Sequence, residues 1–246
     1  MSEEDILSPD GLDDKELTKR LHKLFKEVHP DDQERALAYA YDLGRGLVLL
    51  RTLPQGVTAF GSARVREGDK YYDKARELGG LLAQNGHPVI TGGGPGIMEA
   101  VNRGAFEFGG RSIGLNITLE HEQFANPYLS DEMEFHYFFA RKVMLSMASK
   151  VYVYFPGGFG TLDELSEILC LMQEGKMPRM PVFLFGKSYW KPLDKFFRSR
   201  LLANKMIKAP DLNIYKITDD IEDVVKAANK IGHQRIQENL YDHYKK

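Results

Sequence analysis

Two glycine-rich segments each join a short apolar run to a helical pattern, and this arrangement restricts the fold more than any other feature. The run 151–155 is followed by Pro156-Gly-Gly-Phe-Gly-Thr, and residues 88–91 are followed by Gly92-Gly-Gly-Pro-Gly. Runs rich in β-branched and aromatic residues predict buried strands, and glycine permits turns that residues with side chains rarely make. A strand, a glycine turn and a helix together predict the βα unit of an α/β protein.

Further units of the same kind alternate along the chain. We predict strands at 57–60, 88–91, 112–116, 134–138, 151–155, 181–185 and 214–217, with helices at about 70–85, 96–108, 140–149, 160–175, 189–202 and 219–231. This alternation favours a doubly wound, Rossmann-like parallel sheet of about seven strands with helices on both faces. Ligands of such sheets bind beyond the carboxyl ends of the strands, where turns 61–64, 92–96 and 156–161 are expected to converge.

The segments on either side of this domain have a different character. Residues 13–52 carry helical apolar stripes but no glycine turn, which predicts a helical extension packed on the main domain at 53–232. The acidic residues 1–12 are expected to form a disordered tail, and the polar residues 233–246 a helical tail.

Composition excludes several classes of protein. The chain has 246 residues and a formal net charge of −2, so no general electrostatic attraction to nucleic acid is expected. The acidic N-terminus differs from a signal or transit peptide, and no apolar stretch is long enough to span a bilayer. Cys170, the single cysteine, is expected to be buried, and the histidines lack metal-ligand spacing. We therefore predict a cytoplasmic protein without a metal site or a membrane partner.

Both glycine turns open a helix, which predicts an anion site. Helix N-termini present unpaired N–H groups and the positive end of the helix dipole, and missing β-carbons allow a phosphate to come close. A dinucleotide fingerprint does not fit, because the spacing of the glycines differs and strand 112–116 ends in Asn116. No Gly-Lys-Ser/Thr follows either turn, so triphosphate chemistry is not expected. A monophosphate is the ligand that these turns suit.

Charged residues near the two turns suggest a chemical role. Glu99 and Glu164 each stand in the first turns of a helix, where a carboxylate repels phosphate and therefore serves another part of the ligand. Arg141 and Lys142 stand at a helix start, where cations oppose the helix dipole unless a ligand or an acid compensates. The alternative for this basic pair is a solvent-exposed position.

Three further residues are candidates for ligand contacts. Ser62 and Arg64, in the first turn, can offer a hydroxyl and a guanidinium to phosphate oxygens, although an ordinary surface turn would look the same. Met98 begins a helix beside a glycine turn and can touch a base.

Glu164 with Arg141 makes a plausible hydrolytic pair. Cleavage of an N-glycosidic bond develops oxocarbenium character at C1′, which an anion stabilises, and the attacking water needs a base. An arginine can hold the sugar phosphate and keep the carboxylate ionised.

These motifs resemble the LOG family of cytokinin riboside 5′-monophosphate phosphoribohydrolases, a family often labelled lysine decarboxylase. The family's Pro-Gly-Gly-x-Gly-Thr-x-x-Glu motif is matched in full at 156–164, its Arg-Lys pair at 141–142, its Gly-Gly-Gly-Pro-Gly-Ile-Met-Glu stretch at 92–99 and its Gly-Ser turn at 61–62. The resemblance covers about residues 55–230. No lysine stands in a pyridoxal context, so the decarboxylase label has no support in the sequence.

The resemblance implies roles for individual residues. Arg141 and Glu164 would be the catalytic pair. The substrate would be bound by Ser62, Arg64, Gly93, Gly94, Gly96, Met98, Glu99, Lys142, Gly157, Gly158, Gly160 and Thr161. The reaction implied is hydrolysis of a purine-type nucleoside 5′-monophosphate, such as AMP or a cytokinin riboside monophosphate, without metal or organic cofactor, by a homodimer or larger homo-oligomer. The alternative is a non-catalytic nucleotide sensor or carrier on the same fold.

Overall fold

The computed structural model describes residues 14–118 and 125–231, so the predicted tails at 1–12 and 233–246 lie outside the described residues. Its centre is one seven-stranded sheet in the order β4-β3-β2-β1-β5-β6-β7, with every neighbouring pair parallel. The strands are β1 Gly56–Phe60, β2 Val89–Thr91, β3 Ser112–Ile117, β4 Asp131–Phe135, β5 Ser149–Tyr154, β6 Val182–Phe185 and β7 Tyr215–Thr218.

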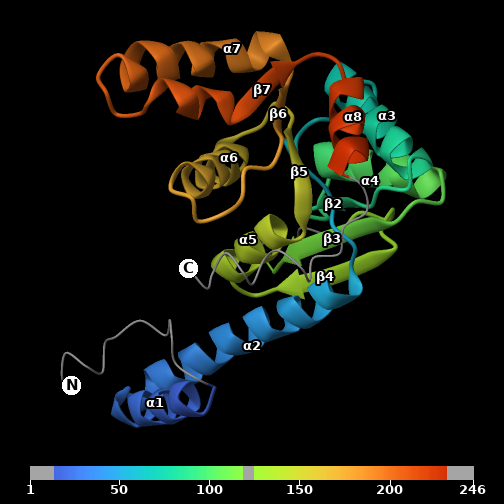
Figure 1. Ribbon diagram of the computed structural model, residues 1–246. Coiled ribbons are helices and arrows are strands. Elements are labelled where there is room, and N and C mark those ends of the chain that lie inside the picture. The colour runs from blue at the N-terminus through green and yellow to red at the C-terminus, as the bar shows by residue number, and fades with distance from the viewer. Residues whose placement is uncertain (1–13, 119–124, 232–246) are drawn as a thin grey trace.

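Helices connect and cover these strands (Figure 1). They are α1 Asp14–Glu27, α2 Pro30–Thr52, α3 Lys70–Gln84, α4 Ile97–Glu107, α5 Phe138–Met147, α6 Phe159–Gln173, α7 Lys187–Phe196 and α8 Glu222–Ile231, with a π-helical turn η2 at Phe197–Leu202 and a 3₁₀ turn η3 at Ala209–Asn213.

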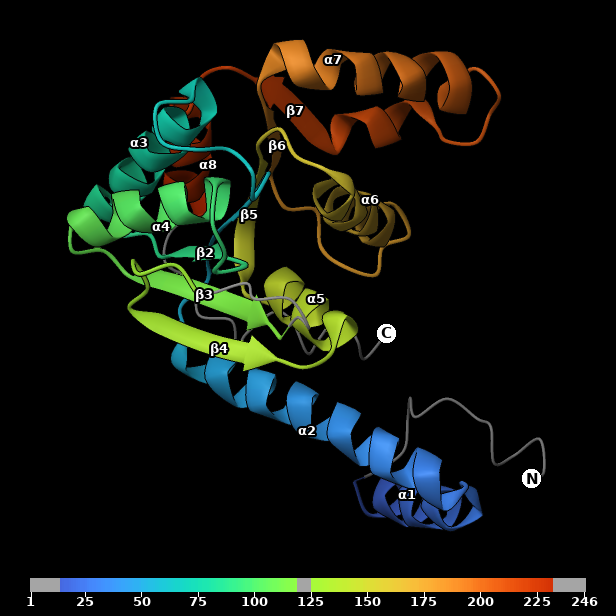
Figure 2. The same cartoon turned by 180° about the vertical axis from the view of Figure 1, so that it is seen from behind.

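Two apolar cores hold the helices to the sheet. One core packs α2, α5, α6 and α7 against one face, and the other packs α3, α4 and α8 against the opposite face. Figure 2 shows the same two layers from behind. The doubly wound, Rossmann-like parallel sheet predicted from the sequence is therefore confirmed.

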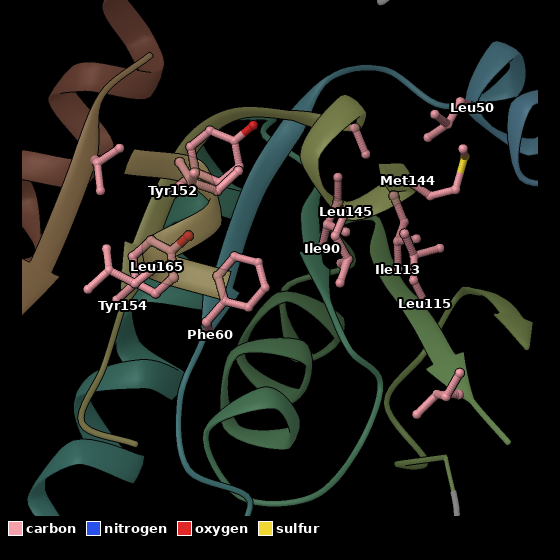
Figure 3. Packing of buried hydrophobic residues seen from close by; sticks show 14 of the residues in the cluster. Leu50, Phe60, Ile90, Ile113, Leu115, Met144, Leu145, Tyr152, Tyr154 and Leu165 are labelled. Carbon is pink, nitrogen blue, oxygen red and sulfur yellow. The ribbon is translucent and has the colours of Figure 1, made fainter. Parts of the chain in front are cut away.

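Alternation along β5 serves both cores. Tyr152 and Tyr154 point into the core beneath α5 and α6, while Val151 and Val153 point into the other core, as the two-residue period of a strand requires. Figure 3 shows Tyr154 beside Phe60, and the two rings stack with centroids 4.9 Å apart. Because both faces of β5 are buried, its sequence is a nearly continuous apolar run.

The edge strand β4 lies earlier in the chain than predicted. We expected a strand at 134–138, but β4 ends at Phe135 and α5 begins at Phe138. Along β4 the exposed Glu132 and Glu134 alternate with the buried Met133 and Phe135, a pattern typical of a strand with one covered face. The prediction placed this strand too late because it relied on the aromatic-rich run at 135–138.

One smaller expectation was wrong. Cys170 lies on the exposed side of α6 rather than in the core. The helix expected at 189–202 is present, although it begins at Lys187 and changes to π-helical hydrogen bonding at Phe197.

The helical extension consists of α1 and α2. The far half of α2 lies along β4 and α5, with Leu50 in the core, while α1 and the near half project away from the sheet (Figures 1 and 2). The division of the chain into a tail, an extension and a main domain stays a prediction.

Candidate functional site

The direction of the strand order reverses between β1 and β5, and a cavity of about 900 Å³ opens at this point. Successive strands run from β1 outward to β4 on one side and from β5 outward to β7 on the other, so the turns after β1 and β5 diverge to opposite faces. Such a switch point is the usual ligand site of a doubly wound sheet. The cavity is lined by residues 60–65, Gly92, Met98, Phe138, Arg141, residues 156–164 and Tyr189.

Backbone hydrogen bonds of Ser62 connect the turn after β1 to the turns after β2 and β5. Its N–H donates to the carbonyl of Pro156 at 3.0 Å, and its carbonyl accepts from the N–H of Ile97 at 3.1 Å. Gly96 has a φ of +74°, and a β-carbon there would lie well inside van der Waals contact with the Ser62 carbonyl. Gly96 is therefore required by the packing of the turns themselves.

Gly158 and Gly160 differ from Gly96 because the protein fills none of the space beside them. A β-carbon at either position would meet no atom within 4 Å, and neither residue has a positive φ. In the described part of the chain, no hydrogen bond uses their N–H groups or that of Phe159, as expected for the first turn of α6. These two glycines thus leave room, and free donors, for an anion in the cavity.

The carbonyl of Gly157 accepts a hydrogen bond from a residue that follows β6, the strand next to β5. The Tyr189 hydroxyl, at the start of α7, donates to this carbonyl. On the other side of the turn, a β-carbon at Gly157 would overlap the side chain of Thr161, which is itself buried. The glycine turn is therefore fixed before any ligand arrives.

Glu164 is a buried acid with an oxygen that the protein leaves unsatisfied. Its side chain is 8% exposed, and its Oε2 has no hydrogen-bond partner among the described residues. Burial raises the pKa of Glu164 to about 7, against the opposing charges of Arg141 and Lys142. A carboxyl with such a pKa exchanges protons readily at neutral pH, as general acid–base chemistry requires.

Arg141 is held at a fixed position opposite this acid. Its Nε donates to the carbonyl of Leu115 on β3 at 2.7 Å, and its guanidinium lies directly against Gly92, where a β-carbon would displace it. Burial lowers the pKa of Arg141, while the charge of Glu164 raises it. Arg141 lines the cavity, and among the described ion pairs none joins it to Glu164.

Lys142 joins the two helices that carry this pair. Its Nζ lies 2.9 Å from Asp163 Oδ2 and 3.1 Å from Glu167 Oε2. The lysine therefore connects α5 to α6 and does not line the cavity.

The cavity brings together most of the site residues predicted from the sequence. Its lining includes Ser62, Arg64, Met98, Arg141, Gly157, Gly158, Gly160, Thr161 and Glu164, but not Gly93, Gly94, Gly96, Glu99 or Lys142. The described contacts of these five residues are with other parts of the protein, and their role in ligand binding stays a prediction.

The turn after β2 illustrates these contacts. The N–H of Gly93 donates to the Thr91 hydroxyl, and Asn126 donates to the carbonyls of Gly93 and Gly94. Glu99 accepts a 2.9 Å hydrogen bond from the hydroxyl of Tyr72 on α3.

Four aromatic residues that were not among the predicted site residues line the cavity, namely Phe60, Phe138, Phe159 and Tyr189. Tyr189 follows β6, so the rule that ligands bind at carboxyl strand ends would have found it if that turn had been searched. Phe138 and Phe159 line the cavity although both are exposed. Phe159 occupies the variable position of the glycine motif, where we had considered only the glycines.

The described residues contain no group of three His, Cys, Asp or Glu side chains able to hold a metal ion. Across the same residues no helix is both long and apolar enough to cross a membrane.

Comparison with known proteins assigns the chain to a family. Residues 98–228, more than half of the chain, match the family described as "Possible lysine decarboxylase". The chain belongs to this family. It is the LOG family, as the motifs in the sequence predicted.

Curated LOG-family relatives are named phosphoribohydrolases. A cytokinin riboside 5′-monophosphate phosphoribohydrolase of Rhodococcoides fascians is 25% identical over 181 residues, covering 72% of this chain and 90% of the relative. The probable rice enzyme LOGL2 is 30% identical over 128 residues, covering 51% of this chain and 52% of that protein. The chain thus matches about half the length of the rice relative.

A solved structure of the same fold has a different described role. The molybdenum cofactor carrier protein of Chlamydomonas reinhardtii has a TM-score of 0.53 and 25% identity, and the match covers 72% of this chain and 95% of the carrier. Proteins named as enzymes are thus relatives of this chain in sequence, and a protein named as a carrier shares its fold.

Proposed function

We propose that this chain hydrolyses the N-glycosidic bond of a purine-type nucleoside 5′-monophosphate, AMP or a cytokinin riboside monophosphate, to free base and ribose 5-phosphate. The observation that carries the proposal is the position of Glu164. Glu164 lines the same cavity as a glycine turn with free N–H groups, and its buried Oε2 has no hydrogen-bond partner among the described residues. One ligand with both a phosphate and an electron-deficient carbon satisfies both features.

The residues divide the work between binding and chemistry. The N–H groups of the turn at 158–160 bind the 5′-phosphate at the N-terminus of α6, supported by the hydroxyl of Thr161. Arg141 positions the ribose phosphate and balances the charge of Glu164. Ser62 and Arg64, which also line the cavity, remain candidates for ligand contacts.

The reaction breaks the bond between C1′ and the base nitrogen and forms a bond between C1′ and a water oxygen. Positive charge develops on the ribose ring before the water is fully bonded, and the Glu164 carboxylate stabilises this charge. The same carboxylate accepts the proton of the attacking water, and the leaving base nitrogen takes up a proton. The pKa of about 7 keeps a large share of Glu164 ionised at neutral pH.

A second candidate is a non-catalytic carrier on the same scaffold. The observation that favours it is the likeness to the carrier protein of Chlamydomonas reinhardtii. A carrier needs the glycine turn but has no use for a buried carboxylate beside it. The description of the family as a decarboxylase finds less support, since Lys142 is engaged by two carboxylates.

A product assay distinguishes the two functions. The protein is incubated with AMP, isopentenyladenosine monophosphate and other nucleoside monophosphates, and free base and ribose 5-phosphate are measured. Hydrolysis of AMP with little hydrolysis of adenosine is expected, because the glycine turn recognises the phosphate. Tight binding of the nucleotides without release of any base would favour the carrier.

Substitutions in α6 test the assigned role. Glu164→Gln is expected to lower kcat at least about 100-fold, since general base and charge stabilisation are both lost, with little change in nucleotide affinity. Glu174→Gln, at the exposed far end of the same helix, serves as the control. A Glu164→Gln protein that retains its kcat would contradict the assignment.

The remaining expectations belong to this proposal. The enzyme works in the cytoplasm as a homodimer or larger homo-oligomer and requires neither a metal nor an organic cofactor.

A further inference from the structure

A buried carboxylate reaches from the helical extension to the start of α5. Asp42, on α2, is 1% exposed. Its Oδ2 accepts hydrogen bonds from the N–H groups of His136 at 2.7 Å and Tyr137 at 3.1 Å. Its Oδ1 lies 3.2 Å from His136 Nδ1 and 3.8 Å from the guanidinium of Arg45.

This contact replaces a cap that α5 itself lacks. Tyr137 is the N-cap residue of α5, its side chain makes no capping hydrogen bond, and the first turn of α5 contains no acid. That first turn carries Arg141, whose charge opposes the helix dipole. The carboxylate of Asp42 satisfies two backbone donors just before the helix and supplies negative charge where the dipole favours it.

Two further contacts hold α2 against the same helix. A β-carbon at Gly46 would lie 2.5 Å from Met144 Cγ, so α2 and α5 pack closely there. The ring of Tyr39 packs edge-on against Tyr137 and Phe139, with centroids 4.5 and 5.0 Å away. The extension therefore packs against the start and the first turns of α5.

We propose that Asp42 is a positioning residue for Arg141. It fixes the turn between β4 and α5, and through that turn it holds the guanidinium at the cavity opposite Glu164. The inference deepens the proposed function and rests on it, because it gives the helical extension a task in the same site.

Removing the carboxylate leaves two N–H groups of the turn without their acceptor. We expect the turn to shift until these N–H groups find other acceptors. Arg141 follows the turn, because its hydrogen bond to the Leu115 carbonyl fixes only its Nε. Displacement of a catalytic group by about 1 Å can cost on the order of 100-fold in rate.

Kinetics on the full chain give the first test. Asp42→Ala is expected to lower kcat about 10- to 100-fold. The loss of affinity for ribose 5-phosphate should be smaller, because the N–H groups of the turn at 158–160 still bind the phosphate when Arg141 moves. Asp42→Asn keeps an oxygen able to accept both N–H groups, so it is expected to retain most of the activity. If Asp42→Ala fails to fold, Asp42→Ser is used instead. The serine side chain is too short for its hydroxyl to reach the N–H groups of both His136 and Tyr137.

A control variant distinguishes an effect on the position of Arg141 from an effect on the stability of the whole fold. Val224 is fully buried on α8, in the core on the opposite face of the sheet from α5. Val224→Ala destabilises the fold without touching α5, and its kcat should equal that of the unmodified protein. An equal loss of kcat in Val224→Ala and Asp42→Ala would reduce the role of Asp42 to general stability and overturn the proposal.

The second test needs no catalysis. Glu164 is surrounded by Arg141 and Lys142 on α5 and by Asp163 and Glu167 on α6, and the charge of Arg141 lowers its pKa. When the carboxyl of Glu164 is titrated by ¹³C NMR and assigned with Glu164→Gln, the midpoint should move to higher pH in Asp42→Ala but not in Val224→Ala. An unchanged midpoint in a folded Asp42→Ala protein would refute the inference.

This titration also separates the two hypotheses. If the unmodified protein releases no base from any nucleotide, the proposed hydrolysis fails, yet the comparison of midpoints still decides whether Asp42 positions Arg141.

Discussion

At the scale of single residues, the glycines around the cavity serve two different purposes. Gly96 has a positive φ and no space for a β-carbon, so the fold itself requires glycine there. Gly158 and Gly160 have ordinary backbone angles and open space beside them, so the fold alone would accept alanine. Their identity is explained only if a ligand occupies that space.

We therefore expect substitution of these glycines to separate binding from stability. Gly160→Ala should leave the free energy of unfolding unchanged or raise it by up to about 1 kcal/mol, because alanine restricts the unfolded chain. The same change should weaken nucleotide binding at least about tenfold, measured by calorimetry. Gly96→Ala should instead destabilise the protein by about 2 kcal/mol or more. Full nucleotide affinity in Gly160→Ala would show that no phosphate lies against this turn.

The raised pKa of Glu164 has a measurable effect on stability. The value rises from 4.5 to about 7 on folding, so between these pH values the folded state binds the proton more tightly and stability falls as pH rises. Glutamine does not titrate. Glu164→Gln should therefore match the unmodified protein near pH 4 and be more stable at pH 8, by about 3 kcal/mol in urea unfolding. Equal stability at pH 8 would mean that the carboxyl is not destabilised by burial.

At the scale of secondary structure elements, α3 and α4 are joined through glycines. A β-carbon at Gly79 would overlap the carbonyl of Val101, and one at Gly104 would overlap the carbonyl of Arg76. Backbone atoms meet backbone atoms there, so neither helix can move aside cheaply. By contrast, Gly44, within α2, has nothing within 4 Å.

These two surroundings predict opposite effects of the same substitution. Gly79→Ala should destabilise the protein by about 2–4 kcal/mol, since the helices must separate to admit one methyl group. Gly44→Ala should stabilise it by about 0.5–1 kcal/mol, the ordinary helix preference for alanine. Thermal and urea unfolding of both variants measure the difference. A neutral Gly79→Ala would show that the helix pair packs less closely than described here.

The elements also show what local sequence can reveal. The strands buried on both faces, such as β5, were predicted correctly because continuous apolar runs identify them. The edge strand β4 was misplaced because alternating glutamates conceal its covered face. Glu164 and Arg141 were recognisable from their positions beside a glycine turn and a helix start. Asp42 and Tyr189 were not, because their partners lie in other parts of the chain and only the fold brings them together.

At the scale of the whole molecule, stability is unevenly distributed. None of the described side chains from residue 15 to Tyr41 is buried, whereas Asp42, Gly46 and Leu50 of the same extension are. Helices that bury little apolar surface gain little stability from packing.

Hydrogen exchange should reproduce this division. Amides of α1 are expected to open with a free energy of about 0–2 kcal/mol, while those at 42–52 should approach the protection of the sheet. Measurement at two protein concentrations adds a test of self-association, because a homo-oligomer that covers α1 would make its protection depend on concentration. Uniform protection at high dilution would contradict the expected gradient.

The reversal of strand order between β1 and β5 has a consequence for biosynthesis. The two walls of the cavity, residues 60–65 and 156–164, come from adjacent strands that the ribosome makes far apart in time. A growing chain that has completed only β1 to β4 has no pocket, however well those strands have paired. Retention of a nucleotide would thus serve as a simple assay for a finished fold, since truncated or half-assembled chains lack one wall.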